Sequence, residues 1–176
     1  DIAIFDGVQP DPSDENILAG VSAAQVHGAE AIVAVGGGSV MDAAKVIAIA
    51  CKHGDEMSAW MGIEKSQGAG LPLVCIPTTA GPGSEVTKVA VITDSKRNIK
   101  MLTLSRYLLP VIAIVVYELS LSMPPALTAG VAADTFTHGV QAFVSRKANS
   151  LTDPAAHTFT TLRAQYLPPP WHYGSD

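Results

Sequence analysis

The order of apolar and turn-forming segments predicts an α/β fold with a mostly parallel sheet, followed by helices. Short continuous apolar runs at residues 31–35, 71–76 and 112–116 are typical of strands buried on both faces of a parallel sheet. After Pro124-Pro125 no strand pattern returns, and the remaining segments have helical spacing. We therefore expect strand–helix alternation over the first two thirds of the 176 residues and helices over the last third.

The first part of the chain should contain two helices and a buried strand. A strand-like apolar segment at residues 2–5 opens it. Ser13 can cap a helix through its hydroxyl, and apolar residues then recur roughly at helical spacing until Gly28. The apolar run at 31–35 predicts the next strand, and a second helix should begin at Ser39 and end near residue 50.

The middle of the chain should contain a strand, a hairpin and a further strand. Residues 71–76 form the expected strand. Residues 86–93 alternate somewhat between apolar and polar, and a polar turn at 94–98 separates them from 99–104, which predicts a hairpin. The apolar run at 112–116 predicts the last strand.

Three helical segments should make up the last third, at residues 126–130, 133–145 and 153 to about 165. On the last of these, His157 is expected to be partly buried. The three prolines at 168–170 cannot continue a helix, since proline lacks the amide hydrogen and its ring clashes with the preceding turn.

Composition limits the classes of function. The chain has 16 Asp and Glu against 11 Lys and Arg, so it lacks the basic surface that binding to nucleic acid requires. Its most apolar run, residues 108–117, is shorter than the roughly 20 residues that cross a bilayer. Cys51 and Cys75 form no disulfide framework and fit a reducing compartment. We therefore expect a cytoplasmic protein that binds neither nucleic acid nor a membrane.

Gly36-Gly37-Gly38-Ser39 lies between an expected strand and an expected helix. Glycine lets the backbone approach a ligand closely, and the free amides of a helix start face an anion, so this segment predicts a phosphate or pyrophosphate site. The alternative is a tight strand–helix turn, although such a turn needs one glycine and rarely three. The common G-x-G-x-x-G pattern is absent.

A second loop follows the next expected strand, at residues 77–85. Ligands of open parallel sheets bind beyond the carboxyl ends of the strands, so this loop and the glycine-rich segment should line one crevice. The hydroxyls of Thr78, Thr79 and Ser84 could bond phosphate, ribose or an amide there. The alternative is a connection that contains proline and glycine and binds nothing.

Asp134 and His138 stand four residues apart in an expected helix, so their side chains share one face. A carboxylate with an imidazole suits a divalent metal such as Zn²⁺ or Fe²⁺. Two ligands do not complete a site, however, and an Asp–His pair without a metal is the alternative. Any further ligand would have to come from His157, His172 or another chain.

Taken together, these motifs resemble those of the iron-containing (group III) alcohol dehydrogenases. The similarity runs without obvious gaps from Ile4 to about Asp153. The stretches that carry it are Phe5-Asp-Gly-Val-Gln-Pro-Asp-Pro, Ala34-Val-Gly-Gly-Gly-Ser-Val-Met-Asp-Ala-Ala-Lys45, Ile76-Pro-Thr-Thr-Ala-Gly-Pro-Gly-Ser-Glu-Val-Thr87, Val91-Ile-Thr-Asp94, Leu119 to Leu127, Asp134-x-x-x-His138 and Ala148-Asn-Ser-Leu-Thr-Asp153.

The resemblance implies a Rossmann-like dinucleotide-binding domain at residues 1–122, lacking its first strand–helix unit, and the beginning of an all-α metal-binding domain at 123–176. It implies an oxidoreductase that transfers a hydride reversibly between a small primary or secondary alcohol and NAD or NADP. A divalent metal, Fe²⁺ or Zn²⁺, would act as a Lewis acid on the alcohol oxygen. A homodimer is expected, because an incomplete sheet and unpartnered helices would expose apolar surface.

The resemblance also implies two sets of site residues. The cofactor set comprises Gly36, Gly37, Gly38 and Ser39 at the pyrophosphate with Asp42 nearby, Thr78 and Thr79 on the adenine and ribose side, and Lys100 and Leu119 as further contacts. The catalytic set comprises Asp134 and His138, the first two metal ligands.

The sequence departs from the family pattern at several positions. Pro82 stands where the family usually has Thr, Val116 where an acidic residue is usual, and Gln141 where Glu is usual. Ala132-Ala133 replaces the usual pair of Gly and a hydrophobic residue. Two alternatives therefore stand beside the dehydrogenase: a catalytically incompetent nucleotide-binding fragment, and a relative of the glycerol dehydrogenases.

Overall fold

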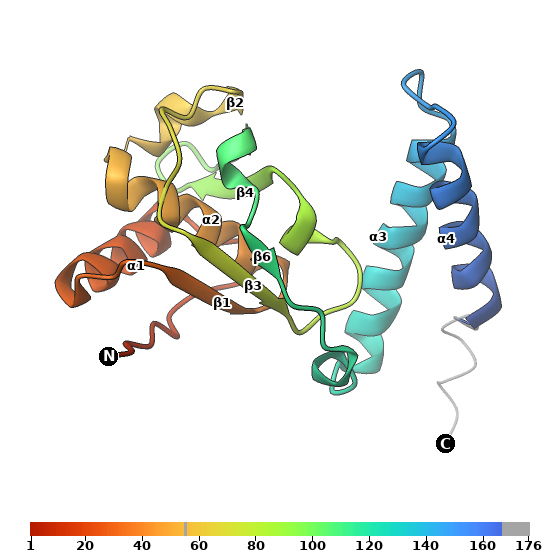
Figure 1. Ribbon diagram of the computed structural model, residues 1–176, viewed down its shortest axis with the longest axis horizontal. Helices are drawn as coiled ribbons and strands as arrows, with labels where there is room; N and C mark the ends of the chain where they lie inside the picture. Colours follow the sequence, from red (N-terminus) through yellow and green to blue (C-terminus); the bar gives the residue numbers. More distant parts are fainter. Residues whose placement is uncertain (55, 167–176) are drawn as a thin grey trace. The chain divides into compact units, whose positions relative to one another are not determined.

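The computed structural model describes residues 1–54 and 56–166, which form two compact units (Figure 1). The first unit comprises residues 1–78 and 83–120. The second comprises residues 79–82 together with those from 121 onward.

A three-stranded parallel sheet lies at the centre of the first unit. Its strand order is β1 (Ile32–Gly36), β3 (Leu73–Pro77), β6 (Ile112–Ala113). β1 and β3 pair from Ile32 opposite Leu73 to Gly36 opposite Pro77, so both strands end at the same edge. Helix α2 (Gly38–His53) follows β1 and packs on one face of this sheet (Figure 1). The predicted α/β class with a parallel sheet is confirmed.

A second, smaller sheet contains the predicted hairpin. Its strand order is β2 (Gly62–Ile63), β5 (Ile99–Leu104), β4 (Val89–Asp94), and β4 and β5 are antiparallel. β2 was not predicted, because two residues are too short to carry a pattern. Four short 3₁₀ helices complete the described part of this unit: η1 (Met57–Trp60), η2 (Ser84–Val86), η3 (Arg106–Leu108) and η4 (Tyr117–Ser120).

Helix α1 (Asp14–His27) begins and ends where the sequence predicts. The Ser13 Oγ accepts a hydrogen bond from the Asn16 N–H at 3.2 Å, and Gly28 ends the helix with φ of 68°, a conformation that glycine adopts easily. The larger hydrophobic core lies where α1, α2 and the second sheet meet. It contains Ile17, Val21, Ala43, Val46, Ile47, Ile49, Ala50, Met57, Trp60, Ala90, Ile92, Met101 and Leu108.

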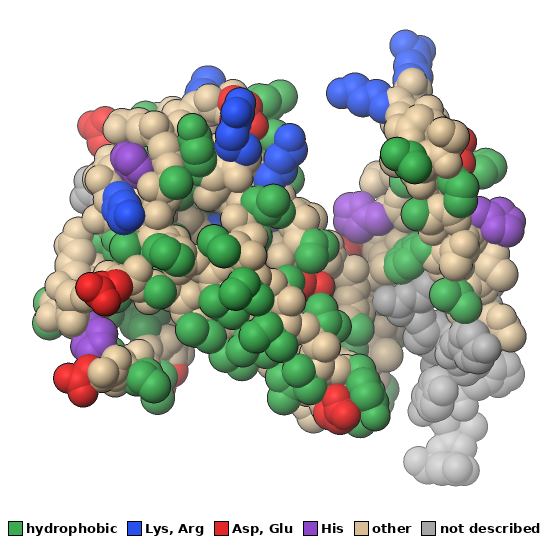
Figure 2. Space-filling model, in the orientation of Figure 1, with side chains coloured by type: hydrophobic (Ala, Val, Ile, Leu, Met, Phe, Trp, Pro, Cys, Tyr) green, Lys and Arg blue, Asp and Glu red, His purple; other side chains and the backbone are tan. Residues whose placement is uncertain are grey.

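Three expectations about the strands are wrong. No strand forms at residues 2–5, and the strand expected at 112–116 has only two residues. The runs are also not buried on both faces, since Val33 and Val35 are 61% and 55% exposed. Within the first unit a helix covers only one face of the parallel sheet, and Figure 2 shows hydrophobic side chains gathered over the other face.

The second unit is a pair of helices, α3 (Pro125–Phe143) and α4 (Thr152–Tyr166). They pack closely at Gly139, where an added Cβ would lie 3.0 Å from the Phe159 Cδ1. α3 is one helix where two segments were expected, because a glycine such as Gly130 inside a helix costs only about 1 kcal/mol. Of the described helices, none is both long and apolar enough to cross a membrane. The prolines at 168–170 and His172 lie outside the described residues.

Candidate functional site

The carboxyl ends of β1 and β3 meet the start of α2 at one place, the glycine corner, which we define as Gly36–Ser39 with Thr78. The Thr78 N–H donates a hydrogen bond of 2.9 Å to the Gly36 carbonyl oxygen, so the first residue after β3 lies beside the glycine-rich segment. A Cβ on Gly36 would lie 2.6 Å from the Val40 Cγ2, so packing explains this first glycine. The structure therefore places the start of the second loop, at Thr78, beside the glycine-rich segment.

The start of α2 differs from the start of α1 in how its amides are satisfied. α1 has a capping hydroxyl on Ser13 and two acids, Asp14 and Glu15, in its first turn. The N-cap residue of α2 is Gly37, which has no side chain to cap the helix, and the first turn of α2 carries no acidic residue. The first amides of a helix lack intrahelical acceptors and carry partial positive charge. The start of α2 is thus chemically suited to an anionic ligand.

A buried lysine ties α2 to η2 and β4. Lys45 is 1% exposed. Its Nζ donates hydrogen bonds to the Ser84 Oγ at 2.9 Å, the Thr87 Oγ1 at 3.2 Å and the Val89 carbonyl oxygen at 2.8 Å. Burial lowers the pKa of Lys45, and the nearby Asp42 carboxylate opposes that shift.

Asp42 connects α2 to the second sheet. Its Oδ1 accepts a hydrogen bond from the Ser84 hydroxyl at 2.6 Å, and its Oδ2 accepts one from the Val91 N–H at 3.0 Å. The expectation that the Ser84 hydroxyl could face a ligand is wrong, since Ser84 is 7% exposed and bonds Asp42 and Lys45 inside the unit. The turn η2 directs this side chain inward.

The remaining residues of the expected cofactor set lie at different places. Lys100 is on β5, where its ammonium forms an ion pair with Asp11, whose N–H donates to the Ser39 Oγ at 3.3 Å. Leu119 is in η4, after β6, and is 39% exposed. Thr79 is half-buried and belongs to the second unit. Asp11 and Lys45 were not predicted as parts of the site, although a lysine within the apolar run of α2 is a visible signal.

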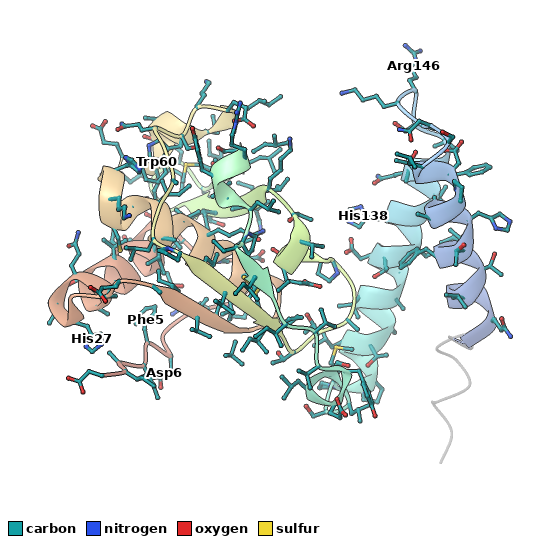
Figure 3. The ribbon with its side chains drawn as sticks, in the orientation of Figure 1. Phe5, Asp6, His27, Trp60, His138 and Arg146 are labelled. Atoms are coloured by element: carbon teal, nitrogen blue, oxygen red, sulfur yellow. The ribbon has the colours of Figure 1, made fainter. Side chains whose placement is uncertain are left out.

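Asp134 and His138 lie on an exposed face of α3, and Figure 3 shows His138 projecting from the helix. The Asp134 Oδ1 is 3.6 Å from the His138 Nε2, too far for a good hydrogen bond, and the side chains are 51% and 60% exposed. Two bonds of about 2.0–2.2 Å to one ion would fit this separation, so the pair suits a divalent metal.

The described residues provide only this pair. No group of three or more His, Cys, Asp or Glu within residues 1–54 and 56–166 could hold a metal ion. His157 was expected to be partly buried, but it is exposed on α4. Within the described part of the chain, Asp134 and His138 thus supply two donors for a metal and no third donor joins them.

In the first unit, parallel strands end beside a glycine-rich helix start, the place where open α/β sheets bind their ligands. The sequence model of the iron-containing alcohol dehydrogenase family matches residues 1–117, which is more than half of the chain. The chain therefore belongs to this family, as its motifs suggested.

Individual relatives agree with this assignment. The chain is 38% identical over 176 residues to the NAD-dependent methanol dehydrogenase of Bacillus methanolicus, covering 100% of this chain and 46% of that protein. It is 39% identical over 167 residues to the 1,3-propanediol dehydrogenase of Citrobacter freundii, covering 95% of this chain and 43% of the relative. The crystal structure of a 1,3-propanediol oxidoreductase superposes with a TM-score of 0.89 at 39% identity, over 93% of this chain and 43% of that one. The chain thus spans less than half the length of each.

Proposed function

We propose that this chain forms the nucleotide-binding part, and supplies two metal ligands, of an enzyme that oxidises small alcohols reversibly with NAD or NADP. The observation that carries the proposal is the start of α2, which has neither a side-chain cap nor an acid and lies where two parallel strands end. In this proposal residues 1–122 bind the cofactor, and residues 123–176 begin the helical metal-binding domain.

The proposed cofactor contacts follow from this placement. The amides at Gly36–Ser39 would bond the pyrophosphate, and Thr78 and Thr79 would line the adenine and ribose side. Lys100 and Leu119 would be further contacts. Asp42 would act indirectly, because both of its carboxylate oxygens already accept hydrogen bonds that tie α2 to Ser84 and β4.

Asp134 and His138 would hold the metal, and their donor chemistry suits Fe²⁺ or Zn²⁺. When bound, such a metal polarises the alcohol oxygen as a Lewis acid. The charge of Asp134 would offset that of the cation and help to fix it. Because the relatives are named for methanol and 1,3-propanediol, we propose a small primary alcohol as the substrate class.

Calorimetry with NAD⁺, NADP⁺ and ADP tests the nucleotide site. We expect binding to the chain and its loss in Gly37→Asp, because the new carboxylate would lie where the pyrophosphate binds. Gly37 is the N-cap of α2, with φ of −85°, and aspartate is a favourable residue at that position, so the fold should be retained.

The matched control is Gln25→Glu, which adds the same charge at an exposed position. Gln25 is near the end of α1, which leads into the start of β1, whereas the glycine corner follows the end of β1. Gln25→Glu should bind like the unaltered chain. If the chain binds none of the three nucleotides, or if Gly37→Asp binds as well as Gln25→Glu, the proposal is wrong.

A second candidate is a nucleotide-binding chain without activity of its own. The observation that favours it is the absence of a third metal ligand among the described residues. We expect the 176-residue chain with Fe²⁺ or Zn²⁺ to form no NADH from NAD⁺ and 1-propanol. Metal-dependent NADH formation above that of His138→Ala would contradict this second candidate.

We also propose that the chain forms a homodimer. Parallel sheets are normally covered on both faces, and the uncovered face of β1 and β6 exposes Val33, Val35 and Ile112 (Figure 2). Light scattering on the purified chain should give twice the monomer mass, and a monomer mass would contradict the proposal.

A further inference from the structure

The segment before α1 runs beside the hairpin of the second sheet, and this fixes the position of Asp11. The Thr93 N–H donates a hydrogen bond of 2.9 Å to the Pro12 carbonyl oxygen, and Ser13 forms a bridge with Thr93. Thr93 on β4 is paired with Lys100 on β5. The segment before α1 therefore lies along β4, and the Lys100 side chain reaches Asp11 from the neighbouring strand β5.

Asp11 makes two contacts that join this hairpin to the glycine corner. Its carboxylate forms an ion pair with the Lys100 ammonium, and its N–H donates to the Ser39 Oγ in the first turn of α2. Its backbone has φ of 53°, a left-handed conformation that aspartate and asparagine tolerate better than most residues. A negative charge is thus held next to the helix start whose own first turn has none.

We infer that Asp11 sets the affinity of the glycine corner for the dinucleotide pyrophosphate. In the free protein the Asp11 carboxylate forms an ion pair with the Lys100 ammonium. A bound pyrophosphate would compete for that ammonium and would be repelled by the carboxylate. Binding therefore exchanges the Asp11–Lys100 ion pair for a Lys100–phosphate pair. This inference rests on the proposed cofactor site and assigns to it a residue that lowers, rather than raises, affinity.

The expected effect is modest. The side chains of Asp11 and Lys100 are 76% and 56% exposed, and exposed ion pairs contribute little because water and salt screen them. We expect removal of the Asp11 charge to tighten binding about threefold at low salt, in the range that such pairs support. The gain should shrink as salt is added.

Asp11→Asn is the direct test, measured by calorimetry with NAD⁺ and with inorganic pyrophosphate at low and high NaCl. Asparagine keeps the size and tolerates the left-handed backbone, so only the charge changes. We expect tighter binding of both ligands at low salt. In a Lys100→Gln background the same substitution should have a smaller effect, since there is no ammonium left for Asp11 to occupy.

Glu64→Gln is the matched control. Glu64 also has φ of 53° and also forms an exposed ion pair, with Arg106, but its N–H bonds the carbonyl oxygen of Leu104, four residues along β5 from Lys100. It should bind both ligands like the unaltered chain.

The outcomes separate the inference from the proposed function. If the chain binds NAD⁺ and Asp11→Asn binds it no more tightly than Glu64→Gln, the inference is wrong and the proposed function stands. Weaker binding by Asp11→Asn would also contradict the inference, because Asp11 would then be a direct acceptor for the cofactor. If neither the unaltered chain nor Asp11→Asn binds NAD⁺, both the inference and the proposed function are wrong.

Discussion

The glycine corner and the Asp134–His138 pair carry the two halves of the proposed chemistry, and they are built differently. The corner is made of backbone groups at the start of α2, a helix that Lys45 and Asp42 tie to η2 and β4. The pair consists of two side chains on an exposed helix face, 3.6 Å apart and not hydrogen-bonded to each other. The proposed nucleotide site thus rests on a helix fixed by buried hydrogen bonds, whereas the proposed metal site needs further donors to fix an ion.

The largest expected effect is the loss of the buried lysine that ties α2 to η2 and β4. In Lys45→Met the Val89 carbonyl and two hydroxyls lose their donor, and the Asp42 carboxylate loses the charge beside it. Removing one partner of a buried ionic network typically costs about 3–5 kcal/mol, and we expect about 3 kcal/mol here because Asp42 is 19% exposed. Urea unfolding followed by circular dichroism measures the change.

Lys52→Met is the control for this prediction. Lys52 is in the last turn of the same helix but exposed, so its loss should cost less than about 1 kcal/mol. Equal stability of the two variants would show that the Lys45 hydrogen bonds do not stabilise the first unit.

The second unit has its own tightly packed point, and it predicts the next largest effect. Gly139→Leu places a side chain where even a Cβ would lie 3.0 Å from Phe159, so α3 and α4 must move apart. We expect a loss of about 1–2 kcal/mol, since overpacking costs about 1–3 kcal/mol and replacement of glycine in a helix returns part of that.

Gly130→Ala on the same helix should do the opposite. An added Cβ at Gly130 meets no atom within 4 Å, so the gain in helix propensity should stabilise α3 by about 0.5–1 kcal/mol. If both variants change the urea midpoint in the same direction, the close approach of the helices at Gly139 is not what limits packing.

The same contrast explains what could be predicted from the sequence. Backbone features were readable, because glycine runs, caps and apolar runs report local conformation directly: Ser13, Gly28 and the corner at Gly36 are where the patterns place them. Long-range side-chain partners were not readable. The burial of Lys45 depends on Ser84 and Val89, about 40 residues away, and no local pattern encodes that distance.

Burial of strand faces also could not be predicted. An apolar run indicates that both faces of a strand can be buried. It does not indicate whether the segment that buries a face belongs to the same unit. Val33 and Val35 therefore read as buried and are exposed. The positions of Asp134 and His138 on one helix face follow from spacing alone, whereas their roles stay a prediction.

A pH effect should distinguish the turn between β4 and β5 from the rest of the surface. Hydrogen bonds from the Arg97 N–H, and the Arg97 side chain, lower the pKa of Asp94 below its ordinary 3.8. Because the folded-state pKa is lowered, the stabilisation from this carboxylate is present above the unfolded-state value and is lost as pH falls through the folded one.

We therefore expect the urea midpoint to decrease when the pH is lowered below about 4. In Asp94→Asn this decrease should be smaller, because the titrating carboxylate is gone. Asp6→Asn, at an exposed position in the N-terminal segment (Figure 3), should keep the full decline. If Asp94→Asn and the unaltered chain lose stability in parallel between about pH 5 and pH 3, the Asp94 carboxylate does not stabilise the hairpin turn.

The smallest effect on stability is expected at Asp134 and His138, the proposed metal ligands. His138 is 60% exposed and makes no short contact with Asp134, so His138→Ala should change the free energy of unfolding by less than about 0.5 kcal/mol. The same substitution should abolish any stabilisation that added Zn²⁺ gives the chain, because a single carboxylate is left to bind the ion.

His157→Ala, an exposed histidine on α4, is the matched control and should keep the response to Zn²⁺. A Zn²⁺ response that survives His138→Ala but not His157→Ala would place the metal site elsewhere on the helical unit.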